Sequence, residues 1–338
     1  MVRRTNRKRR LTRQALLLIV TGVSLYFVFP SLIEVFSSWP RLVDLEPWWL
    51  APMVLLEAGS FTSIVALQRI CLRTRAFWPV LTAQLAGNAF SRIVPGGAAA
   101  GAAVQYPMLV DAGVPRGRVA SGLTTANVVT FGVLLALPLA ALPTIVLGLP
   151  ISRGLTQAAV MGAIGFAVIA GLAVAITVSD TPLRLLGRGA QAIRNRLRHQ
   201  REPVRDLPER LIAERNNAVA ALGRNWWKAL LAGLGWWLFD YSALLLALAA
   251  IGASPDPSLV LVAYAGGLVL TMIPLTPGGL GFVEAGLTGL LALAGIEAAD
   301  AALATLAYRL VSYWLPIPLG AAAVFVHRRH SGSVAETA

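Results

Sequence analysis

Five ionisable residues lie within stretches of the sequence that are otherwise apolar, and these residues could carry chemistry. They are Glu57, Arg92, Asp240, Glu284 and Arg309. A charge at the centre of a membrane helix costs roughly 2.5–3.5 kcal/mol on insertion scales, so each of them requires a partner or a function. The guanidinium groups could bind an anion, and the carboxyl groups could bind a substrate or transfer protons. The alternative is structural pairing between helices.

Two Pro-Gly-Gly sequences interrupt apolar regions, at 77–112 and 258–295. Backbone that leaves helical geometry at membrane depth is tolerated only beside protein or an aqueous cavity. We therefore predict that each region is a re-entrant helical hairpin with its Pro-Gly-Gly sequence at the apex. If either region is instead a pair of short spans, two crossings are added and the rest of the topology is unchanged.

The predicted substrate-binding residues combine these two features. Arg92 lies three residues before Pro95, where it could bind a lipid phosphate together with a helix N-terminus, or else cap the carbonyls of the first arm. Glu284 lies near the start of the second half-helix, and Arg309 in the next span could pair with it. A direct pair is possible, but the expected depths favour a bridge of water or a lipid head group. The full predicted set is Arg92, Pro95, Gly96, Gly97, Asp240, Pro277, Gly278, Gly279, Glu284 and Arg309.

The composition is that of a polytopic membrane protein. Of the 338 residues, 57% are hydrophobic and 13% are charged, and the mean hydropathy is +0.68. Soluble domains are about 45–50% apolar and about 25% charged. Six apolar runs exceed the roughly 18 residues that a crossing requires: 14–36, 48–69, 118–141, 155–179, 227–251 and 298–326. We predict an all-α fold of six crossings and two opposed re-entrant hairpins, with an uncleaved first span.

Basic residues are concentrated on one predicted side of the membrane. The formal net charge is +13, and 25 of the 29 basic residues fall in five segments: 1–13, 69–75, 116–118, 184–228 and 328–329. The positive-inside rule makes these segments cytoplasmic, which places both termini in the cytoplasm and makes Cys71 reachable from that side. Because the rule accounts for the charge, we predict no nucleic-acid partner.

The chain divides into a basic cytoplasmic N-terminus (1–13), a transmembrane domain (14–327) and a cytoplasmic tail (328–338). Within the transmembrane domain, 180–226 is an Arg-rich cytoplasmic connector. Its arginines recur at helical spacing beside an apolar stripe, so 184–228 could lie on anionic lipid head groups as an interfacial helix. A solvated connector is the alternative.

The two halves of the sequence show an internal similarity. The Pro-Gly-Gly sequences are 182 residues apart, and at that offset nine of the 35 positions from Pro95 to Val129 are identical. Three predicted crossings separate the hairpins, which therefore open to opposite faces, as in inverted-repeat transporters. Chance similarity in an Ala-rich chain is the alternative. Gly97 and Gly101 also have the spacing of a close helix contact, either between copies of the chain or within the hairpin.

Familiar catalytic and metal-binding patterns are absent from the sequence. A single cysteine excludes an intramolecular disulfide and a Cys-based zinc cluster, and the three histidines lie in basic polar segments. There is no Walker A sequence, no Gly-x-Ser-x-Gly elbow and no His-Glu-x-x-His. We therefore predict that the chain is not an enzyme and has no cofactor and no metal site.

The run from Ile273 to Glu284 (IPLTPGGLGFVE), followed by Ala307–Leu310 (AYRL), resembles a known signature. It is similar to that of the lysylphosphatidylglycerol synthase transmembrane-region family, the flippase-like half of the multiple peptide resistance factor. The stretches 88–97 and 237–240 also fit, and the resemblance covers the chain from the first span onward. It implies a lipid-handling membrane protein and places Glu284 and Arg309 at motif positions.

The sequence departs from the family pattern in two places. The stretch 99–105 offers no acidic residue and arginine pair, and the Glu-Arg of the following span falls near Thr125 and Ala126. Lipid contacts that those residues make in relatives cannot be carried over. The resemblance does not imply the aminoacyltransferase activity, since the chain has no segment for that soluble domain.

Together these features predict a multi-pass protein of the cell membrane with a role in lipid transport. We expect it to translocate or present an anionic phospholipid or a lipid-linked sugar across the cytoplasmic membrane. The alternative is a non-transporting membrane partner that scaffolds a glycosyltransferase or a lipid synthase. Assembly as a homo-oligomer is compatible with either function.

Overall fold

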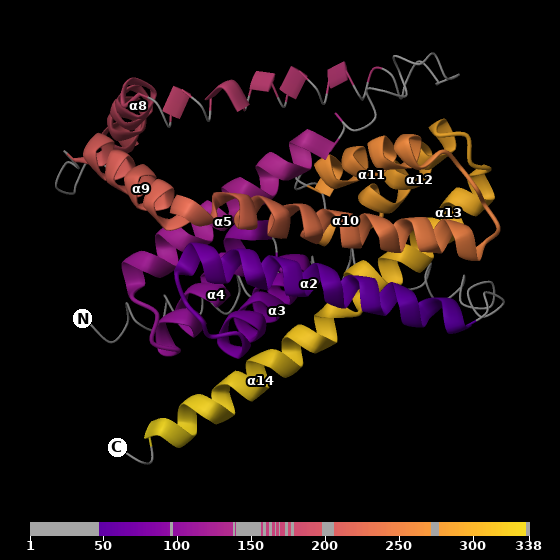
Figure 1. Ribbon diagram of the computed structural model, residues 1–338, viewed down its shortest axis with the longest axis horizontal. Coiled ribbons are helices and arrows are strands. Elements are labelled where there is room, and N and C mark those ends of the chain that lie inside the picture. The colour runs from indigo at the N-terminus through magenta and orange to yellow at the C-terminus, as the bar shows by residue number, and fades with distance from the viewer. Residues whose placement is uncertain are drawn as a thin grey trace, which may run out of the picture.

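The computed structural model describes residues 47–94, 97–137, 139, 157, 160–161, 164–165, 167–168, 170–172, 175–176, 179–197, 206–271 and 277–335. Regular secondary structure in these ranges is helical, as the composition predicts (Figure 1). The α-helices are α2 (Leu50–Leu72), α3 (Trp78–Ile93), α4 (Gly97–Asp111), α5 (Arg116–Ala136), α8 (Thr181–Leu197), α9 (Leu207–Leu222), α10 (Trp226–Ala250), α11 (Pro257–Thr271), α12 (Phe282–Leu293), α13 (Ala298–Arg309) and α14 (Pro316–Ala335). Short turns are η1 (Pro47–Trp49), η3 (Gly223–Asn225), η4 (Pro277–Gly279) and the π-helical η5 (Leu310–Trp314).

Four stretches of the described chain are long and apolar enough to cross a bilayer. They are Leu50–Leu72, Arg116–Ala136, Gly223–Ala250 and Ala298–His327. These stretches correspond to four of the six predicted crossings. The predicted crossing at 14–36 lies outside the described residues, and the one at 155–179 is described only in short, separate pieces.

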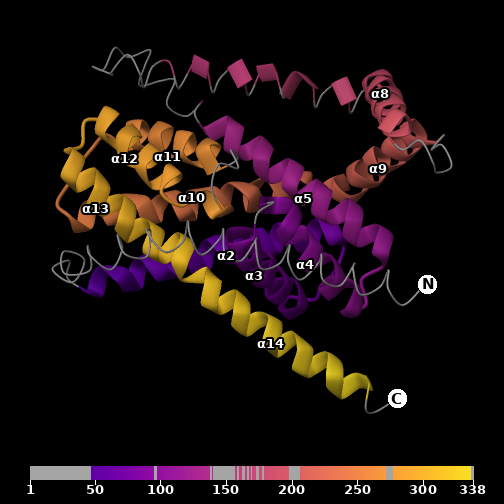
Figure 2. The ribbon, with the colours of Figure 1, turned by 180° about the vertical axis from the view of Figure 1, so that it is seen from behind.

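Two pairs of shorter helices occupy the regions that contain the Pro-Gly-Gly sequences. Helix α3 packs against α4, and α11 packs against α12. Their lengths of 12 to 16 residues correspond to about 18–24 Å at 1.5 Å per residue, which is less than the hydrocarbon thickness of about 30 Å. Figures 1 and 2 place the two hairpins at opposite ends of the bundle.

The first hairpin is closed by a direct contact between glycines of its two arms. A Cβ atom built on Gly101 of α4 would lie 2.7 Å from the carbonyl oxygen of Gly87 in α3 and 3.2 Å from Cβ of Ser91. Only glycine permits this approach. Gly101 therefore packs within the hairpin, one of the two alternatives that the sequence allows, whereas Gly97 makes no such contact.

Helices α2 and α10 form the central pair of the bundle and run antiparallel to each other (Figures 1 and 2). Small residues let the two backbones approach, because Gly235 lies against Ser63 and Gly59 lies against the ring of Phe239. Ser60 donates a hydrogen bond to the Trp236 carbonyl oxygen at 2.9 Å. These contacts fix the facing sides of the two helices, one carrying Glu57 and the other Asp240.

The described part of the connector consists of α8 and α9, which pack against each other. Gly187 of α8 meets the backbone of Pro208 at the start of α9. Asp180 pairs with Arg215 of α9. In the exposed pair Arg210–Asp206, the guanidinium holds the pKa of Asp206 below its ordinary value. Such exposed ion pairs contribute little to stability.

Cys71 corrects one expectation from the sequence. Its side chain is buried near the C-terminal end of α2 and is only 1% exposed. Helix α5 covers it, with Gly122 in contact with the Cys71 carbonyl and with Leu72. A position between two arginines therefore does not make this thiol accessible, and an engineered cysteine is needed to probe topology.

Candidate functional site

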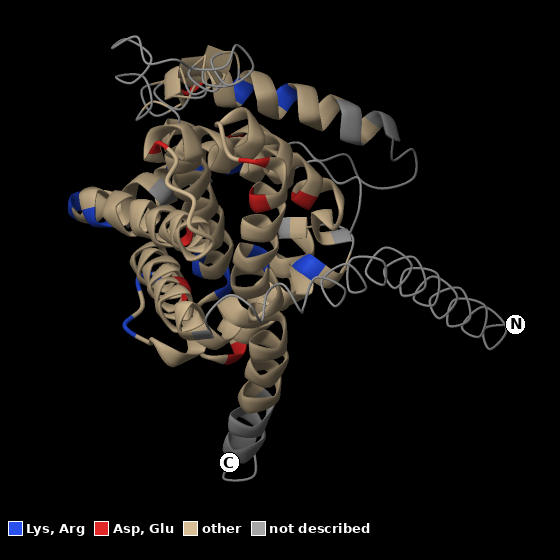
Figure 3. Ribbon diagram, turned by 90° about the vertical axis from the view of Figure 1, so that its right-hand side faces the viewer, with Lys and Arg blue, Asp and Glu red and all other residues tan. Residues whose placement is uncertain are grey.

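The second hairpin contacts the first where η4 meets the C-terminal end of α3. Gly278 of η4 has a φ of +63°, and a Cβ atom there would overlap the Arg92 carbonyl oxygen and the Tyr313 hydroxyl group. The second Pro-Gly-Gly sequence thus lies against the C-terminal end of α3. Residues that the sequence singles out in separate halves of the chain are brought together here. Figure 3 shows the few charged positions within the mostly uncharged bundle.

Arg92 is held by backbone carbonyls of the last span. Its Nη1 atom donates hydrogen bonds to the carbonyl oxygens of Ser312 and Tyr313, each at 2.5 Å. Pro316 has no N–H with which to satisfy the Ser312 carbonyl four residues earlier, and the chain adopts a π turn there. The guanidinium group supplies the missing donor. It therefore caps carbonyls, but those of the last span and not those of its own arm.

The other two guanidinium nitrogens of Arg92, Nε and Nη2, do not donate hydrogen bonds to these carbonyl oxygens. Its side chain is only partly buried, and its guanidinium carbon lies 4.9 Å from the centre of the Tyr313 ring. Among the described residues, Nη1 alone of the guanidinium nitrogens donates hydrogen bonds, and no carboxylate forms an ion pair with Arg92. Nε and Nη2 therefore form no hydrogen bond with the described residues.

Arg309 forms a direct ion pair with Glu284. Its Nη2 and Nε atoms lie 2.8 Å and 2.9 Å from the same oxygen, Oε1. The two side chains are 8% and 13% exposed. The other carboxylate oxygen, Oε2, is buried and accepts no hydrogen bond from the described residues.

The expectation that water or a head group bridges this pair was wrong. It treated the residues after Pro277 as helix, which displaced Glu284 far from the apex. The chain instead forms a 3₁₀ turn and a glycine turn before α12 begins at Phe282. Glu284 is therefore in the first turn of its helix, close to the apex and within reach of Arg309.

Tyr313 connects the two arginines and was not identified from the sequence. Its ring centre lies 4.2 Å from the Arg309 guanidinium carbon, and its hydroxyl donates a hydrogen bond of 3.1 Å to the Arg92 carbonyl oxygen. That carbonyl belongs to the last turn of α3, where helical donors run out. The spacing of four residues between Arg309 and Tyr313 was a signal available in the sequence, because residues at that spacing share a helix face.

Asp240 lies in a second polar cluster, which is buried. Its Oδ2 atom accepts hydrogen bonds from Tyr264 at 2.5 Å and from Tyr308 at 2.7 Å. The Glu57 carboxyl group on α2 lies beside the Asp240 carboxyl group, and Arg92 is near enough to interact with both. The sequence marked Glu57 as ionisable without assigning it to the site, and it gave no signal for the two tyrosines.

The remaining predicted residues have more local roles. Gly279 has a φ of +74° and meets the side chain of Val283. Gly97 has a φ of +50° and begins α4, with no other group within 4 Å of a Cβ position. Pro277 begins η4. Pro95 and Gly96 lie outside the described residues.

A neutral polar cluster between α2, α3 and α4 was also missed. Gln68 and Gln105 each donate an Nε2 hydrogen bond to Oε1 of Gln84, at 2.7 Å and 2.8 Å. Gln68 and Gln84 are buried. The sequence prediction rested on ionisable residues, and glutamine amides are uncharged.

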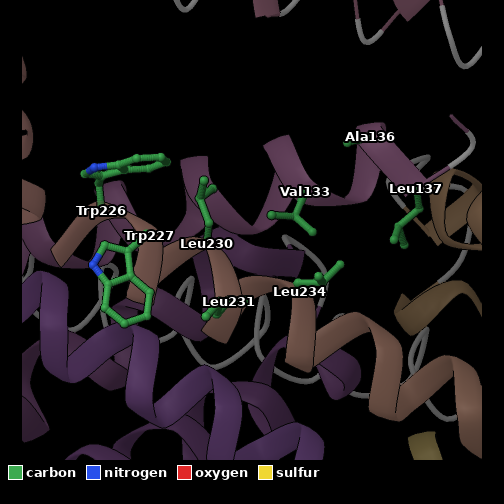
Figure 4. Close-up of a pocket in the computed structure, with 8 residues that line it drawn as sticks. All are labelled: Val133, Ala136, Leu137, Trp226, Trp227, Leu230, Leu231 and Leu234. Carbon is green, nitrogen blue, oxygen red and sulfur yellow. The ribbon is translucent and has the colours of Figure 1, made fainter. Parts of the chain in front are cut away.

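An apolar groove lies away from the polar centre, between α5 and α10 (Figure 4). Its volume is about 550 Å³, and the residues that line it are Val133, Ala136, Leu137, Trp226, Trp227, Leu230, Leu231 and Leu234. None of these side chains is charged, and the indole N–H groups of the two tryptophans are the only side-chain hydrogen-bond donors among them. The charged centre, and not this groove, is therefore the candidate head-group site. Among the described residues, no cluster of His, Cys, Asp and Glu could hold a metal ion.

We expect Gly278→Ala to lower stability strongly. A left-handed φ of +63° costs about 1–2 kcal/mol for a residue with a Cβ, and forcing the turn away from Arg92 and Tyr313 adds about 1–3 kcal/mol. Thermal unfolding of the purified protein in detergent measures the change. Gly289→Ala is the matched control, because this glycine lies within α12 with nothing within 4 Å of its Cβ position. Equal stability of the two variants would contradict the contact between the hairpins.

Comparison with known proteins gives one family and one curated relative. The family described as "Lysylphosphatidylglycerol synthase TM region" matches residues 14–320. A protein described as "UPF0104 membrane protein", from Methanothermobacter thermautotrophicus strain Delta H, is 33% identical over 100 residues. That alignment covers 30% of this chain and 28% of the relative. No solved structure matches the chain.

Proposed function

Because this chain belongs to the lysylphosphatidylglycerol synthase TM region family, a family of membrane domains, we propose that it translocates or presents an anionic lipid across the cytoplasmic membrane. A phospholipid and a lipid-linked sugar phosphate share the phosphate group that the site would recognise. The proposal assigns no chemical reaction and no cofactor to the chain. Family membership supports a membrane role related to lipids, and the site geometry supports the specific activity.

The observation that carries the proposal is the guanidinium group of Arg92, which forms no salt bridge with a carboxylate of the described residues and keeps two nitrogens without a hydrogen bond to them. Arg309 is neutralised by Glu284, whereas Arg92 is held by carbonyl oxygens and the face of Tyr313. Arginine nitrogens arranged in this fork bind phosphate oxygens in pairs. An anion that binds Nε and Nη2 would lie at the end of α3, near Tyr313 of the last span.

The arrangement of the hairpins supports alternating access. The two hairpins lie at opposite ends of the bundle, and Gly278 of one meets the end of α3 in the other. In inverted-repeat transporters, paired interrupted helices surround the substrate site and open it to either side in turn. We propose the same relation here, with the two hairpins as re-entrant elements of an inverted repeat.

A basic pocket provides a first binding place for a head group on the predicted cytoplasmic side. It has a volume of about 430 Å³ and lies between the α2–α3 loop and the junction of α9 with α10. Four arginines line it, namely Arg69, Arg73, Arg75 and Arg224, and no acidic residue is among its described lining. Anionic lipids of the cytoplasmic leaflet attract such clusters. We propose this pocket as a further head-group contact; of the predicted contact at 184–228 it contains Arg224 alone among the arginines.

The bound lipid is the most direct test of ligand class. We expect mass spectrometry of protein extracted in mild detergent to detect anionic lipid in excess over its share of the membrane. Arg92→Gln should reduce that excess, leaving the share held by the basic pocket, whereas Arg116→Gln, an exposed change at the start of α5, should leave it unchanged. Lipid in the proportions of the bulk membrane in the wild-type sample would count against the proposal.

The orientation of the chain can be tested with engineered cysteines. Ala112 is exposed between α4 and α5, and Ser254 is exposed between α10 and α11. We expect an impermeant thiol reagent to label Ser254→Cys in intact cells and Ala112→Cys only in inverted vesicles. The buried Cys71 can remain, with the unmodified protein as the blank. The opposite labelling pattern would reverse the predicted topology and place the termini outside.

The scaffold function remains the second candidate, because the charged centre would also suit a site that holds lipid for another protein. Copurification of a glycosyltransferase or a lipid synthase, together with no lipid movement by the isolated chain, would favour it. Association between copies of the chain is compatible with both functions.

A further inference from the structure

The buried pair formed by Glu57 and Asp240 contains an atom that the structure leaves unsatisfied. The two residues are 5% and 8% exposed and lie on the facing helices α2 and α10. Oε2 of Glu57 is buried and receives no hydrogen bond from the described residues. The group beside it is the Asp240 carboxyl group, which cannot donate a hydrogen bond while ionised.

The groups around this pair come from three further helices. Tyr264 of α11 and Tyr308 of α13 both donate to Oδ2 of Asp240. Arg92 of α3 is the cation that interacts with both carboxyl groups. Two adjacent carboxylates in a low-dielectric environment repel each other too strongly for both to be ionised, so the pair retains a proton. The two phenol donors favour the ionised form on Asp240, which leaves that proton on Glu57.

The balance of charge among the buried ionisable residues also indicates that the Glu57–Asp240 pair holds one proton. Arg309 and Glu284 neutralise each other. The charge of Arg92 is balanced when the Glu57–Asp240 pair carries one negative charge and one proton. An anion bound at Arg92 would add a negative charge, and a second proton on the pair would restore neutrality.

We infer that Glu57 and Asp240 form a proton-binding site, and that binding of an anionic head group at Arg92 is accompanied by uptake of a proton at this pair. The first part is independent of the proposed function, and the second part rests on it. Because binding and protonation are linked, the affinity for the anion rises as the pH falls, by up to about tenfold per pH unit for one proton. A proton gradient could then drive lipid movement.

Infrared spectroscopy tests the proton site without any lipid. Wild-type protein in detergent at neutral pH should show the carbonyl stretch of a protonated carboxylic acid, shifted in D₂O. Glu57→Gln should remove the band, because its amide donates to Asp240 without a titrating proton. Asp111→Asn, which changes an exposed acid at the end of α4, should leave it intact. Absence of the band in wild type, or its persistence in Glu57→Gln, would overturn the site.

Asp240→Asn provides a second variant if Glu57→Gln does not fold, and it should remove the same band. Its amide can donate to Glu57, and the neighbouring tyrosines keep an acceptor in the amide oxygen.

Ligand binding tests the linkage. Short-chain phosphatidylglycerol should bind wild-type protein more tightly as the pH is lowered, and the weakly buffered solution should lose about one proton per ligand bound. Glu57→Gln should bind with an affinity that is nearly independent of pH. Short-chain phosphatidylcholine and inorganic phosphate distinguish an anionic lipid from a neutral lipid and from a free anion.

The infrared and ligand-binding experiments distinguish failure of the proposed function from failure of the proton-binding site. No binding of phosphatidylglycerol at any pH would refute the proposed function, while the infrared result would still decide the proton site. Binding with the same pH dependence in wild type and Glu57→Gln would refute the linkage.

Discussion

Arg92→Gln is expected to reduce translocation of an anionic lipid to the rate of protein-free vesicles. Glutamine can donate to one of the two carbonyls that Arg92 holds, but it brings no charge to the anion site. Leaving the second carbonyl without its donor should cost about 1–3 kcal/mol, which thermal unfolding would detect separately from the loss of transport. The measurement is the transfer of a fluorescent phosphatidylglycerol between leaflets of proteoliposomes.

Two controls separate charge from folding in this experiment. Arg92→Lys keeps the charge without the planar fork and should retain part of the activity. Arg116→Gln removes an exposed arginine outside the site and should behave as wild type. Full activity in a folded Arg92→Gln variant would show that Arg92 only caps the carbonyls of the last span.

The second large effect is expected at the Arg309–Glu284 pair. Both side chains are almost fully buried, and both arginine contacts are made to Oε1. Removing one partner with Glu284→Gln or Arg309→Gln leaves an uncompensated buried charge, which should cost about 3–5 kcal/mol of stability. The double variant should recover much of that loss, and thermal unfolding of the four proteins gives the coupling energy between the two residues.

Transport by the double variant of Glu284 and Arg309 distinguishes a pair that takes part in transport from one that only stabilises the fold. Arg309 lies against the ring of Tyr313, whose hydroxyl group contacts the end of α3 at Arg92. Without the guanidinium group this ring loses its support, so we expect the double variant to be stable and inactive. A double variant that is both stable and active would remove Glu284 and Arg309 from the transport site.

The sequence predicts the parts of this architecture that depend on composition and backbone chemistry. Apolar length locates α2, α5, α10 and the last span, and the Pro-Gly-Gly sequences locate the turns of the two hairpins. The cost of burying charge singles out Glu57, Arg92, Asp240, Glu284 and Arg309, and the last four have polar partners in the structure. Their role in substrate binding stays a prediction. These predictions are local, and each needs only a stretch of neighbouring residues.

The contacts between helices could not be predicted in this way. The pairing of Arg92 with the Ser312 carbonyl depends on Pro316 in a span more than 200 residues away. The accessible position expected for Cys71 failed because α5 covers that end of α2. Tyr264 and Tyr308 resemble ordinary aromatic core residues until the fold brings both to Asp240.

Lipid movement by the purified chain alone is the most direct test of the proposed function. Wild-type protein would be reconstituted into vesicles that carry fluorescent phosphatidylglycerol or fluorescent phosphatidylcholine, and the fraction reached by an impermeant quencher would be followed over time. We predict faster transfer of phosphatidylglycerol than in protein-free vesicles, with little effect on phosphatidylcholine. Equal rates for phosphatidylglycerol with and without the protein would contradict translocation and leave lipid presentation to a partner.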